Sequence, residues 1–301
     1  MNIRNQAKLL TAIIPVNNMA GRLNYLNSWI QEIENYPIQL IIVHDIADED
    51  TDYELKKIIN RYSSLNIILL EGKYGSPGYA RNAGLESATG EWIAFWDSDD
   101  RPRLRTIFNE IIKVQLTYDV LVGGFYTVSA LHGNINKLNS KNASLKSVCM
   151  NPGIWRMVFR KKLVKELKFT NLRMGEDHLF LSELNFADLN TKYVAETFYE
   201  YTIEQTNQLT NSKFAFTDLE KASQIILKHM VNCKSDNTVF FDAFLVIRQQ
   251  LTLMKKGSFI LRIKVIRFII AYARKLNITI LISTINVLVE IITSRSKHKL
   301  T

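Results

Sequence analysis

The sequence predicts an α/β fold with a mostly parallel sheet, followed by a region of helices alone. Three observations lead to this prediction. Short apolar segments of strand length alternate with segments of helical spacing in the first third of the chain. The apolar segments are nearly free of polar residues, as is usual for strands that are covered on both faces. From about Thr206 the alternation stops and only helical patterns follow.

Strands and helices are expected to alternate up to residue 96. The strands are expected at 9–15, 39–43, 66–70 and 92–96, and the helices at 22–34, 51–62 and 79–87. Pro15 is expected to end the first strand, because proline lacks the amide hydrogen that a sheet needs. Thr51 or Asp52 is expected to cap the second helix. Strand, helix and strand in this order predict parallel pairing.

The pattern after residue 118 is less regular. Strands are expected at 119–124, 125–130, 153–160 and 193–201, helices at 161–167 and 179–187, and a mobile polar loop at 134–147. Helices alone are expected at 219–231, 239–253, 259–276 and 278–292. We therefore expect an α/β domain over residues 1–205 and a C-terminal helical region over residues 206–301.

Composition narrows the class of protein. With 47% hydrophobic and 22% charged residues the chain is globular. Cys149 and Cys233 have no metal-binding spacing and imply no disulfide framework, so both fit a reducing cytoplasm as packing residues. We expect no secretory signal, because a strand pattern begins at Ile13 where a signal would need a long apolar segment.

The net charge of +9 lies entirely in the tail, since residues 255–301 hold ten basic residues and one acidic residue. Enzymes of nucleic acids more often carry positive charge around the site, so we expect no nucleic-acid partner. The predicted helix 259–276 gathers basic residues on one side, which is typical of a helix on an anionic membrane. These residues are Lys264, Arg267, Arg274 and Lys275. The alternative is ordinary packing of this helix, with its basic residues solvated.

Three acidic residues, Asp97, Asp99 and Asp100, directly follow the apolar segment 92–96. Carboxylates this close repel one another and resist burial. Mg²⁺ and similar hard cations take oxygen ligands, usually one or two carboxylates together with substrate phosphates. The segment therefore predicts a metal that carries a phosphorylated ligand. The alternative is a solvated acidic turn that starts a helix, with Asp97 or Ser98 as its cap.

Polar residues also follow the first two predicted strands. Asn17 comes just after Pro15, and Asp45 ends the second strand. Ligands of parallel sheets bind beyond the carboxyl ends of the strands. Because these residues and the acidic segment all fall at such ends, the sequence predicts one binding site at this edge of the sheet.

Several segments together resemble the nucleotide-sugar domain of family 2 glycosyltransferases, which have the Rossmann-like GT-A fold. These segments are 11–17, 78–84 and 90–100, with 155–160 and 199–210 as weaker matches, and the resemblance covers residues 9–212. Gly175-Glu176-Asp177 resembles the catalytic acidic pair of the family. The resemblance implies an inverting hexosyl- or N-acetylhexosaminyl-transferase that uses a nucleotide-diphosphate sugar.

The resemblance also implies roles for residues on the donor side. Asp45 would hydrogen-bond the nucleobase, and Arg81 would neutralise phosphate. Asp99, with Asp97, would bind Mn²⁺ or Mg²⁺. The remaining substrate contacts are expected from Pro15, Asn17, Asp97, Asp100 and Trp155. His44 and Ile46 replace an acid and a glycine of the family pattern, so the nucleobase stays open although UDP is favoured.

Asp177 would be the general base on the acceptor hydroxyl, with Glu176 orienting it. Each role has an alternative on the residues themselves. Arg81 could pair with Glu86 on its own helix, the acidic pair could be an exposed helix start, and Trp155 could be a core aromatic.

We expect a cytoplasmic enzyme, peripheral on the inner face of the cell membrane, that adds a sugar to a lipid-linked or polysaccharide acceptor. A nucleotidyltransferase is one alternative, but no glycine-rich basic loop for a triphosphate follows the first predicted strand. A non-catalytic carbohydrate-binding or scaffold protein is the other. The presence of Arg81, Asp97, Asp99 and Asp177 argues against such a decayed site.

Overall fold

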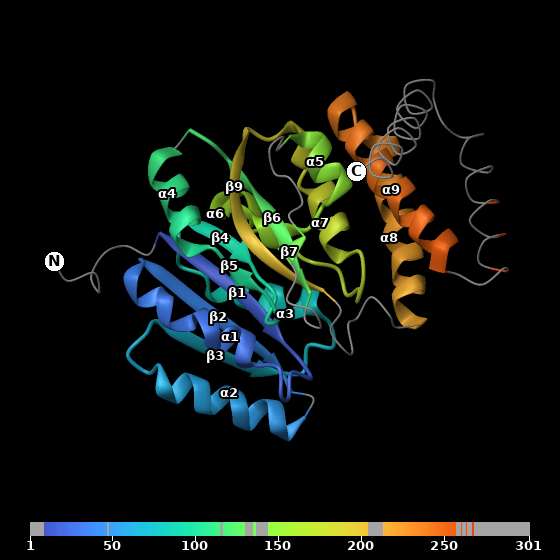
Figure 1. The fold of residues 1–301 in the computed structure, drawn as a ribbon. Coiled ribbons are helices and arrows are strands. Elements are labelled where there is room, and N and C mark those ends of the chain that lie inside the picture. The colour runs from blue at the N-terminus through green and yellow to red at the C-terminus, as the bar shows by residue number, and fades with distance from the viewer. Residues whose placement is uncertain are drawn as a thin grey trace. The chain divides into compact units, whose positions relative to one another are not determined.

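The computed structural model describes residues 9–46, 48–114, 117–129, 135–136, 144–203 and 213–256, together with residues 260, 263 and 267. These residues form one mixed sheet with helices, followed by helices alone (Figure 1). The predicted α/β class with a C-terminal helical region is therefore confirmed. The predicted helix 278–292 and nearly all of 259–276 lie outside the described residues.

The strands are β1 (Leu10–Val16), β2 (Ile38–Asp45), β3 (Ile67–Gly72), β4 (Trp92–Phe95), β5 (Arg101–Pro102), β6 (Val120–Ser129), β7 (Ile135–Asn136), β8 (Met157–Arg160) and β9 (Thr191–Ile203). The α-helices are α1 (Asn24–Trp29), α2 (Glu49–Arg61), α3 (Pro77–Ser87), α4 (Leu104–Val114), α5 (Leu145–Met150), α6 (Lys161–Val164), α7 (Glu176–Glu183), α8 (Lys213–Asn232) and α9 (Asp236–Lys256). Short 3₁₀ helices are η2 (Ile30–Asn35), η4 (Ile154–Arg156) and η5 (Phe186–Asp188).

The chain divides into two compact units. The first comprises Met1–Val148, Gly153–Asn171 and Leu189–Gln208, and so contains the sheet. The second comprises Cys149–Pro152, Leu172–Asp188 and Leu209–Thr301, and so contains α7, α8 and α9. Each unit is therefore made of segments that are distant in sequence. The expected boundary between residues 205 and 206 stays a prediction.

The sheet is parallel on one side and mixed on the other. Its strand order is β3-β2-β1-β4-β8-β6-β9-β5, and the first four strands of this order are parallel. β8 is antiparallel to both of its neighbours, β4 and β6. The expected mostly parallel arrangement therefore holds for the N-terminal half of the sheet.

β1 continues past Pro15, contrary to the expected end there, and pairs Pro15 with Val43 of β2. The main-chain carbonyl of Ile13 accepts a hydrogen bond from Trp96, so the main chain of Ile13 faces β4. Residues two apart in a strand face the same neighbour, so the nitrogen of Pro15 also faces the β4 side. Pairing with β4 already ends at Ile13 and Phe95, and the missing amide hydrogen therefore costs no sheet hydrogen bond.

The helix starts follow local capping chemistry. Asp48, and neither Thr51 nor Asp52, caps α2, because its carboxylate accepts a hydrogen bond of 2.6 Å from the main-chain nitrogen of Thr51. Ser76 caps α3, which begins at Pro77 two residues before the predicted helix. A proline in the first turn fits, since its missing amide hydrogen would have no partner there.

Several other elements differ from the predicted ones. The two strands expected over residues 119–130 form the single strand β6, and α4 was not predicted. The expected loop 134–147 contains β7 and the start of α5, and most of its remainder lies outside the described residues. The expected strand from residue 153 begins only at β8, after the 3₁₀ turn η4.

A tryptophan cluster fixes the end of β4. Trp29 and Trp96 are fully buried and meet edge to face, with ring centroids 5.7 Å apart. The indole nitrogen of Trp29 donates a 3.1 Å hydrogen bond to the main-chain oxygen of Asp100. The acidic turn after β4 is thus anchored by the core beneath it.

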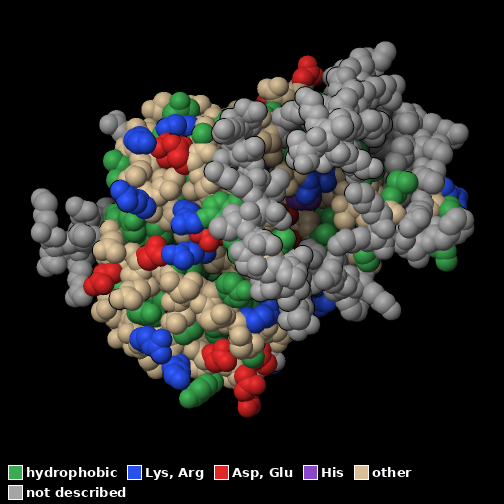
Figure 2. All heavy atoms as spheres, viewed as in Figure 1, with side chains coloured by type: hydrophobic (Ala, Val, Ile, Leu, Met, Phe, Trp, Pro, Cys, Tyr) green, Lys and Arg blue, Asp and Glu red, His purple; other side chains and the backbone are tan. Residues whose placement is uncertain are grey.

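Charged side chains are interspersed on the described part of the face in Figure 2, where Lys and Arg alternate with Asp and Glu. This fits the balance of charges over the first 254 residues, where the net charge is zero. Among the helices of the described residues, none combines the length and the apolar character that a membrane span requires.

Candidate active site

Arg81 and Asp97 form the centre of the predicted donor site. Arg81 lies buried in α3, and its guanidinium donates a 3.0 Å hydrogen bond to a carboxylate oxygen of Asp97. The guanidinium also lies over the ring of Phe169, 5.5 Å from the centroid. The alternative partner Glu86 instead contacts Lys168 at 2.8 Å. The ion pair therefore joins α3 to the end of β4.

Asp45 is held by main-chain and side-chain donors from two loops. Its carboxylate accepts hydrogen bonds from the side chain of Asn17 at 3.0 Å and from the main-chain nitrogens of Tyr74 and Gly75 at 2.8 and 2.9 Å. A carboxylate has about four acceptor positions, so about one stays available for a ligand N–H group. The expected convergence of Asn17 and Asp45 at the end of β1 and β2 is thus observed, and Pro15 lies within β1 just before it.

Asp99 sits where its charge is unfavourable. Burial, and then the charge of Asp97, raise the pKa of Asp99 from 3.8 to about 6. The positive charge of Arg22, in the segment after β1, acts in the opposite direction. A cation bound to Asp97 and Asp99 would relieve this repulsion. The two carboxylates therefore fit a divalent metal that takes its other ligands from phosphate and water.

Asp100 turns inward. Its side chain is 1% exposed, and one carboxylate oxygen accepts a 2.6 Å hydrogen bond from the main-chain nitrogen of Thr202 in β9. Burial, and then the charges of Asp99 and Asp97, raise the pKa of Asp100 well above its usual range. This placement favours a structural role for Asp100 over the expected substrate contact.

Tyr199 is a residue of this site that the sequence did not single out. Its hydroxyl accepts a 2.9 Å hydrogen bond from the main-chain nitrogen of Asp97. Burial, and then the charges of Asp100 and Asp97, raise the pKa of Tyr199 well above its usual range, so the hydroxyl stays protonated. The alternation of aromatic residues along β9 was the available signal, because it places Tyr199 and Tyr201 on one face of the strand.

Trp155 lies flat across that face. Its ring stacks on Tyr199 and Tyr201, with centroid distances of 4.8 and 5.1 Å, and Phe125 meets it edge to face. Gly153 covers the indole closely, since a β-carbon built there would be 2.4 Å from two ring atoms. These contacts favour the core-aromatic alternative for Trp155 over stacking on a sugar.

The acidic pair begins α7 in the second unit. Gly175 precedes it with φ of +87°, a left-handed conformation that glycine adopts without strain. Glu176 is buried, and Asp177 is partly exposed. A carboxylate oxygen of Asp177 accepts a 2.8 Å hydrogen bond from the main-chain nitrogen of His178. This contact fixes the direction of the carboxylate at the helix start.

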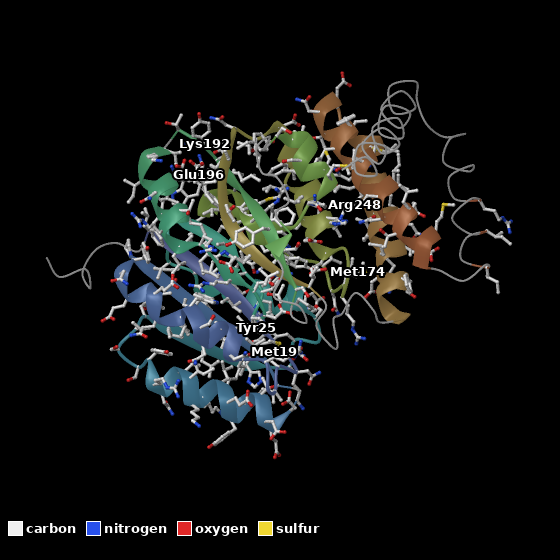
Figure 3. The ribbon with its side chains drawn as sticks, in the orientation of Figure 1. Met19, Tyr25, Met174, Lys192, Glu196 and Arg248 are labelled. Carbon is white, nitrogen blue, oxygen red and sulfur yellow. The ribbon has the colours of Figure 1, made fainter. Side chains whose placement is uncertain are left out.

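Two residues near the acidic pair come from α9 and were not predicted. Arg248 extends from α9 towards α7 (Figure 3), and its charge interacts with that of Asp177. Gln249 contacts the Nδ1 atom of His178 at 3.0 Å. Burial, and then the charge of Arg248, lower the pKa of His178 to about 3. His178 is therefore neutral at physiological pH, in line with a structural role.

Comparison with known proteins identifies relatives of this chain. Glycosyltransferase GlyA of Streptococcus pneumoniae is 23% identical over 220 residues, which is 65% of this chain but 31% of that protein. The poly(ribitol-phosphate) β-N-acetylglucosaminyltransferase TarP of Staphylococcus aureus is 25% identical over 223 residues, 68% of this chain and 67% of that protein. The chain thus spans less than a third of GlyA and two thirds of TarP.

A solved structure shares the fold. Residues 1–349 of S. aureus TarS, in complex with UDP-GlcNAc, superpose with a TM-score of 0.65 and 18% identity, covering 93% of this chain and 79% of that one. This likeness confirms the GT-A fold. The sequence model described as glycosyl transferase family 2 matches residues 11–180, more than half of the chain and including β1, the acidic turn and the start of α7. The chain belongs to glycosyl transferase family 2, a family of enzymes that transfer sugars.

Proposed function

We propose that this enzyme transfers a sugar from a UDP-sugar to a hydroxyl of a lipid-linked or polysaccharide acceptor, with inversion at the anomeric carbon. The proposal rests mainly on one observation. Two pairs of polar side chains form at the carboxyl ends of parallel strands: Asn17, after β1, hydrogen-bonds Asp45 of β2, and Asp97, after β4, hydrogen-bonds Arg81 of α3. Polar side chains collected at this edge of a sheet are typical of a nucleotide site.

On the donor side, Asp45 binds the uracil. Its carboxylate is oriented by Tyr74, Gly75 and Asn17 before any ligand arrives. An acceptor held in this way selects for a base that presents an N–H group, which uracil does. Arg81 lies beside Asp97 and supplies positive charge to the diphosphate. The complex of TarS with UDP-GlcNAc supports a uridine donor.

Asp99 and Asp97 would hold Mn²⁺ or Mg²⁺. The bound ion would offset the negative charge that develops on the leaving diphosphate. Arg81 hydrogen-bonds one carboxylate oxygen of Asp97 and so offsets part of its charge. The second oxygen of Asp97 would be the one that binds the metal. Tyr199 keeps the turn in place through the main chain of Asp97, so the carboxylates are positioned without movement of the backbone.

On the acceptor side, Asp177 removes the proton from the attacking hydroxyl. A carboxylate does this when it is ionised, and the positive charge of Arg248 favours the ionised form. The neutral ring of His178 adds no charge of its own. Glu176 orients Asp177 or the acceptor. Attack from the face opposite the diphosphate inverts the anomeric carbon.

The acceptor class is supported by the relatives. TarP is described as a poly(ribitol-phosphate) β-N-acetylglucosaminyltransferase, so its acceptor is a polymer. A polymer or lipid-linked acceptor would suit an enzyme held at the inner face of the membrane. The basic residues of 255–301, which include Lys264 and Arg274, would bind anionic lipid with about 1 kcal/mol each near the surface.

A panel of nucleotide sugars tests the reaction. The full chain is incubated with UDP-, GDP- and dTDP-sugars and Mn²⁺, and release of the nucleoside diphosphate is measured. We expect hydrolysis of UDP-sugars that disappears when Asp99 is changed to Asn. Release of pyrophosphate from a nucleoside triphosphate would instead identify a nucleotidyltransferase, and binding without any turnover would identify a non-catalytic protein.

Liposome flotation tests the membrane association. The full chain should float with anionic vesicles at low salt and less with neutral ones. Salt should weaken the binding without abolishing it, because burial of apolar side chains is insensitive to salt. Changing Lys264, Arg267, Arg274 and Lys275 together to Gln should reproduce the effect of salt. A chain that stays out of the anionic vesicle fraction at low salt would refute the membrane role.

A further inference from the structure

A second group of metal-ligating side chains lies in the first unit and has no part in the proposed reaction. It consists of His44 at the end of β2, Asp52 in α2 and Glu71 in β3. One potential ligand atom from each of these side chains lies within 4.8 Å of the other two. Within the part of the chain that the structure describes, no other three His, Cys, Asp or Glu side chains approach one another in this way.

The imidazole of His44 is unsatisfied. Its side chain is fully buried, and among the described residues neither ring nitrogen has a hydrogen-bond partner. Its Nδ1 atom lies 3.7 Å from a carboxylate oxygen of Asp52, too far for a hydrogen bond. A buried polar group without a partner is rare in native proteins and costs stability. His44 therefore lacks a partner at the point where two carboxylates converge.

The ammonium of Lys56 contacts two of these three side chains. Its ammonium lies 2.9 Å from Asp52 and 3.2 Å from Glu71, and its side chain is half exposed. The two carboxylates carry a charge of about −2, of which Lys56 offsets half. Its contacts are with the two carboxylates, and among the described residues the ring nitrogens of His44 still have no hydrogen-bond partner. A divalent cation would match the charge of the two carboxylates and bind the ring nitrogen as well.

We propose that His44, Asp52 and Glu71 form a metal site that binds Zn²⁺, and that Lys56 competes with the metal for it. The ligand set points to Zn²⁺, because imidazole with carboxylates suits zinc whereas Mg²⁺ and Ca²⁺ take oxygen ligands. Three protein ligands leave the fourth tetrahedral position to water. The ligand atoms would have to approach to about 3.4 Å from one another for metal–ligand bonds of about 2.1 Å. Asp52 and Glu71 are each about one-third exposed and have room for this movement.

The test is a calorimetric titration of the full chain with Zn²⁺, without nucleotide, at neutral pH. It is done in a background with Asp97→Asn and Asp99→Asn, so that the metal proposed for the donor does not contribute. We expect one Zn²⁺ per chain. Glu71→Gln should weaken Zn²⁺ binding by at least about tenfold. Changing a residue that only supports a metal ligand already costs about 10- to 100-fold in affinity, so loss of a direct ligand should cost at least the lower value. His44→Gln should also weaken Zn²⁺ binding. If this variant does not fold, the result for Glu71→Gln alone decides whether the site binds Zn²⁺.

Lys56 gives the sharper test. Lys56→Met removes the competing charge and keeps the length of the side chain, so Zn²⁺ binding should tighten by about tenfold, a coupling of the size expected for neighbouring charges. Lys57→Met is the matched control, since Lys57 is also exposed on α2 but belongs to neither ion pair. It should leave binding unchanged.

The outcomes separate the possible natures of the cluster. Zn²⁺ binding that is indifferent to Glu71→Gln would overturn the proposal, and so would the absence of binding. If Lys56→Met lowers the unfolding midpoint and leaves zinc affinity unchanged, the cluster is a structural ion pair only. None of these measurements involves a sugar donor, so failure of the proposed reaction would leave the result intact.

Discussion

Changing Asp99 to Asn is expected to stabilise the metal-free protein while it removes activity. Burial and the charge of Asp97 raise the pKa of Asp99 from 3.8 to about 6. The ionised form is thus less favourable in the folded protein than in the unfolded chain. The shift is about two units, and one unit corresponds to about 1.4 kcal/mol, which gives an upper value of about 3 kcal/mol. Solvent that still reaches this side chain reduces the figure to about 1–3 kcal/mol.

The pH dependence has a definite sign. Between about pH 4 and pH 6 the folded protein binds more protons at Asp99 than the unfolded chain does, so stability falls as pH rises through this window. The contribution of protonated Asp99 to the unfolding free energy is fully present below the pKa of Asp99 in the unfolded chain, and it is lost above about pH 6. An asparagine at this position does not titrate. The gain in unfolding free energy from Asp99→Asn should therefore be near zero at low pH and reach its full value at neutral pH.

Urea unfolding followed by circular dichroism measures this difference, with a chelator present and at several pH values. Asp50→Asn is the control, because Asp50 is an exposed carboxylate in the first turn of α2. Addition of Mn²⁺ and UDP should reverse the order, since a ligand stabilises only the protein that binds it. A difference that does not change with pH, or a variant that is less stable at neutral pH, would refute the reasoning.

Three further variants test other parts of the structure. Asp177→Asn should lower kcat by about 10²- to 10⁴-fold and leave UDP-sugar affinity largely unchanged, and an equal loss of affinity would assign Asp177 to the donor. Gly175→Ala should cost about 1–2 kcal/mol of unfolding free energy for its left-handed conformation, plus strain from a β-carbon 3.0 Å from Ala222, and an unchanged urea midpoint would contradict this. Trp155→Ala should cost up to about 3 kcal/mol of unfolding free energy, because the ring is only partly buried and full burial corresponds to about 3–5 kcal/mol, and loss of acceptor affinity alone would restore the sugar-stacking role.

The arrangement of the donor side followed from the sequence because it rests on local chemistry. Apolar strands that end in polar residues are visible in the residues themselves, and parallel pairing brings their ends together. Asn17 and Asp45 therefore meet as expected. What the sequence could not provide was the direction of each side chain within the acidic turn. The side chain of Asp100 turns inward to accept a hydrogen bond from the main chain of Thr202, while Trp29 bonds the main-chain oxygen of Asp100, and both partners lie far away in the chain.

Contacts between distant segments also explain the other differences between the predicted and the observed structure. The continuation of β1 through Pro15 depends on where β4 ends, which no local pattern contains. Tyr199 and Arg248 come from β9 and α9, so only tertiary structure relates them to the predicted site residues Asp97 and Asp177. Local propensity predicts which elements form, and packing between distant segments decides which side chains they present.

The discontinuous make-up of the two units has a consequence for recombining this protein with its relatives. The chain passes from one unit to the other at residues 148, 152, 171, 188 and 208. A chimera that exchanges everything after residue 205 would keep α7 from one parent and take α8 and α9 from the other. The surfaces of Leu219, Ala222 and Gln249 around Gly175 would then come from a different parent than Gly175 itself. A chimera that keeps the packing of the second unit intact therefore requires residues 172–188 to be exchanged together with the C-terminal helices.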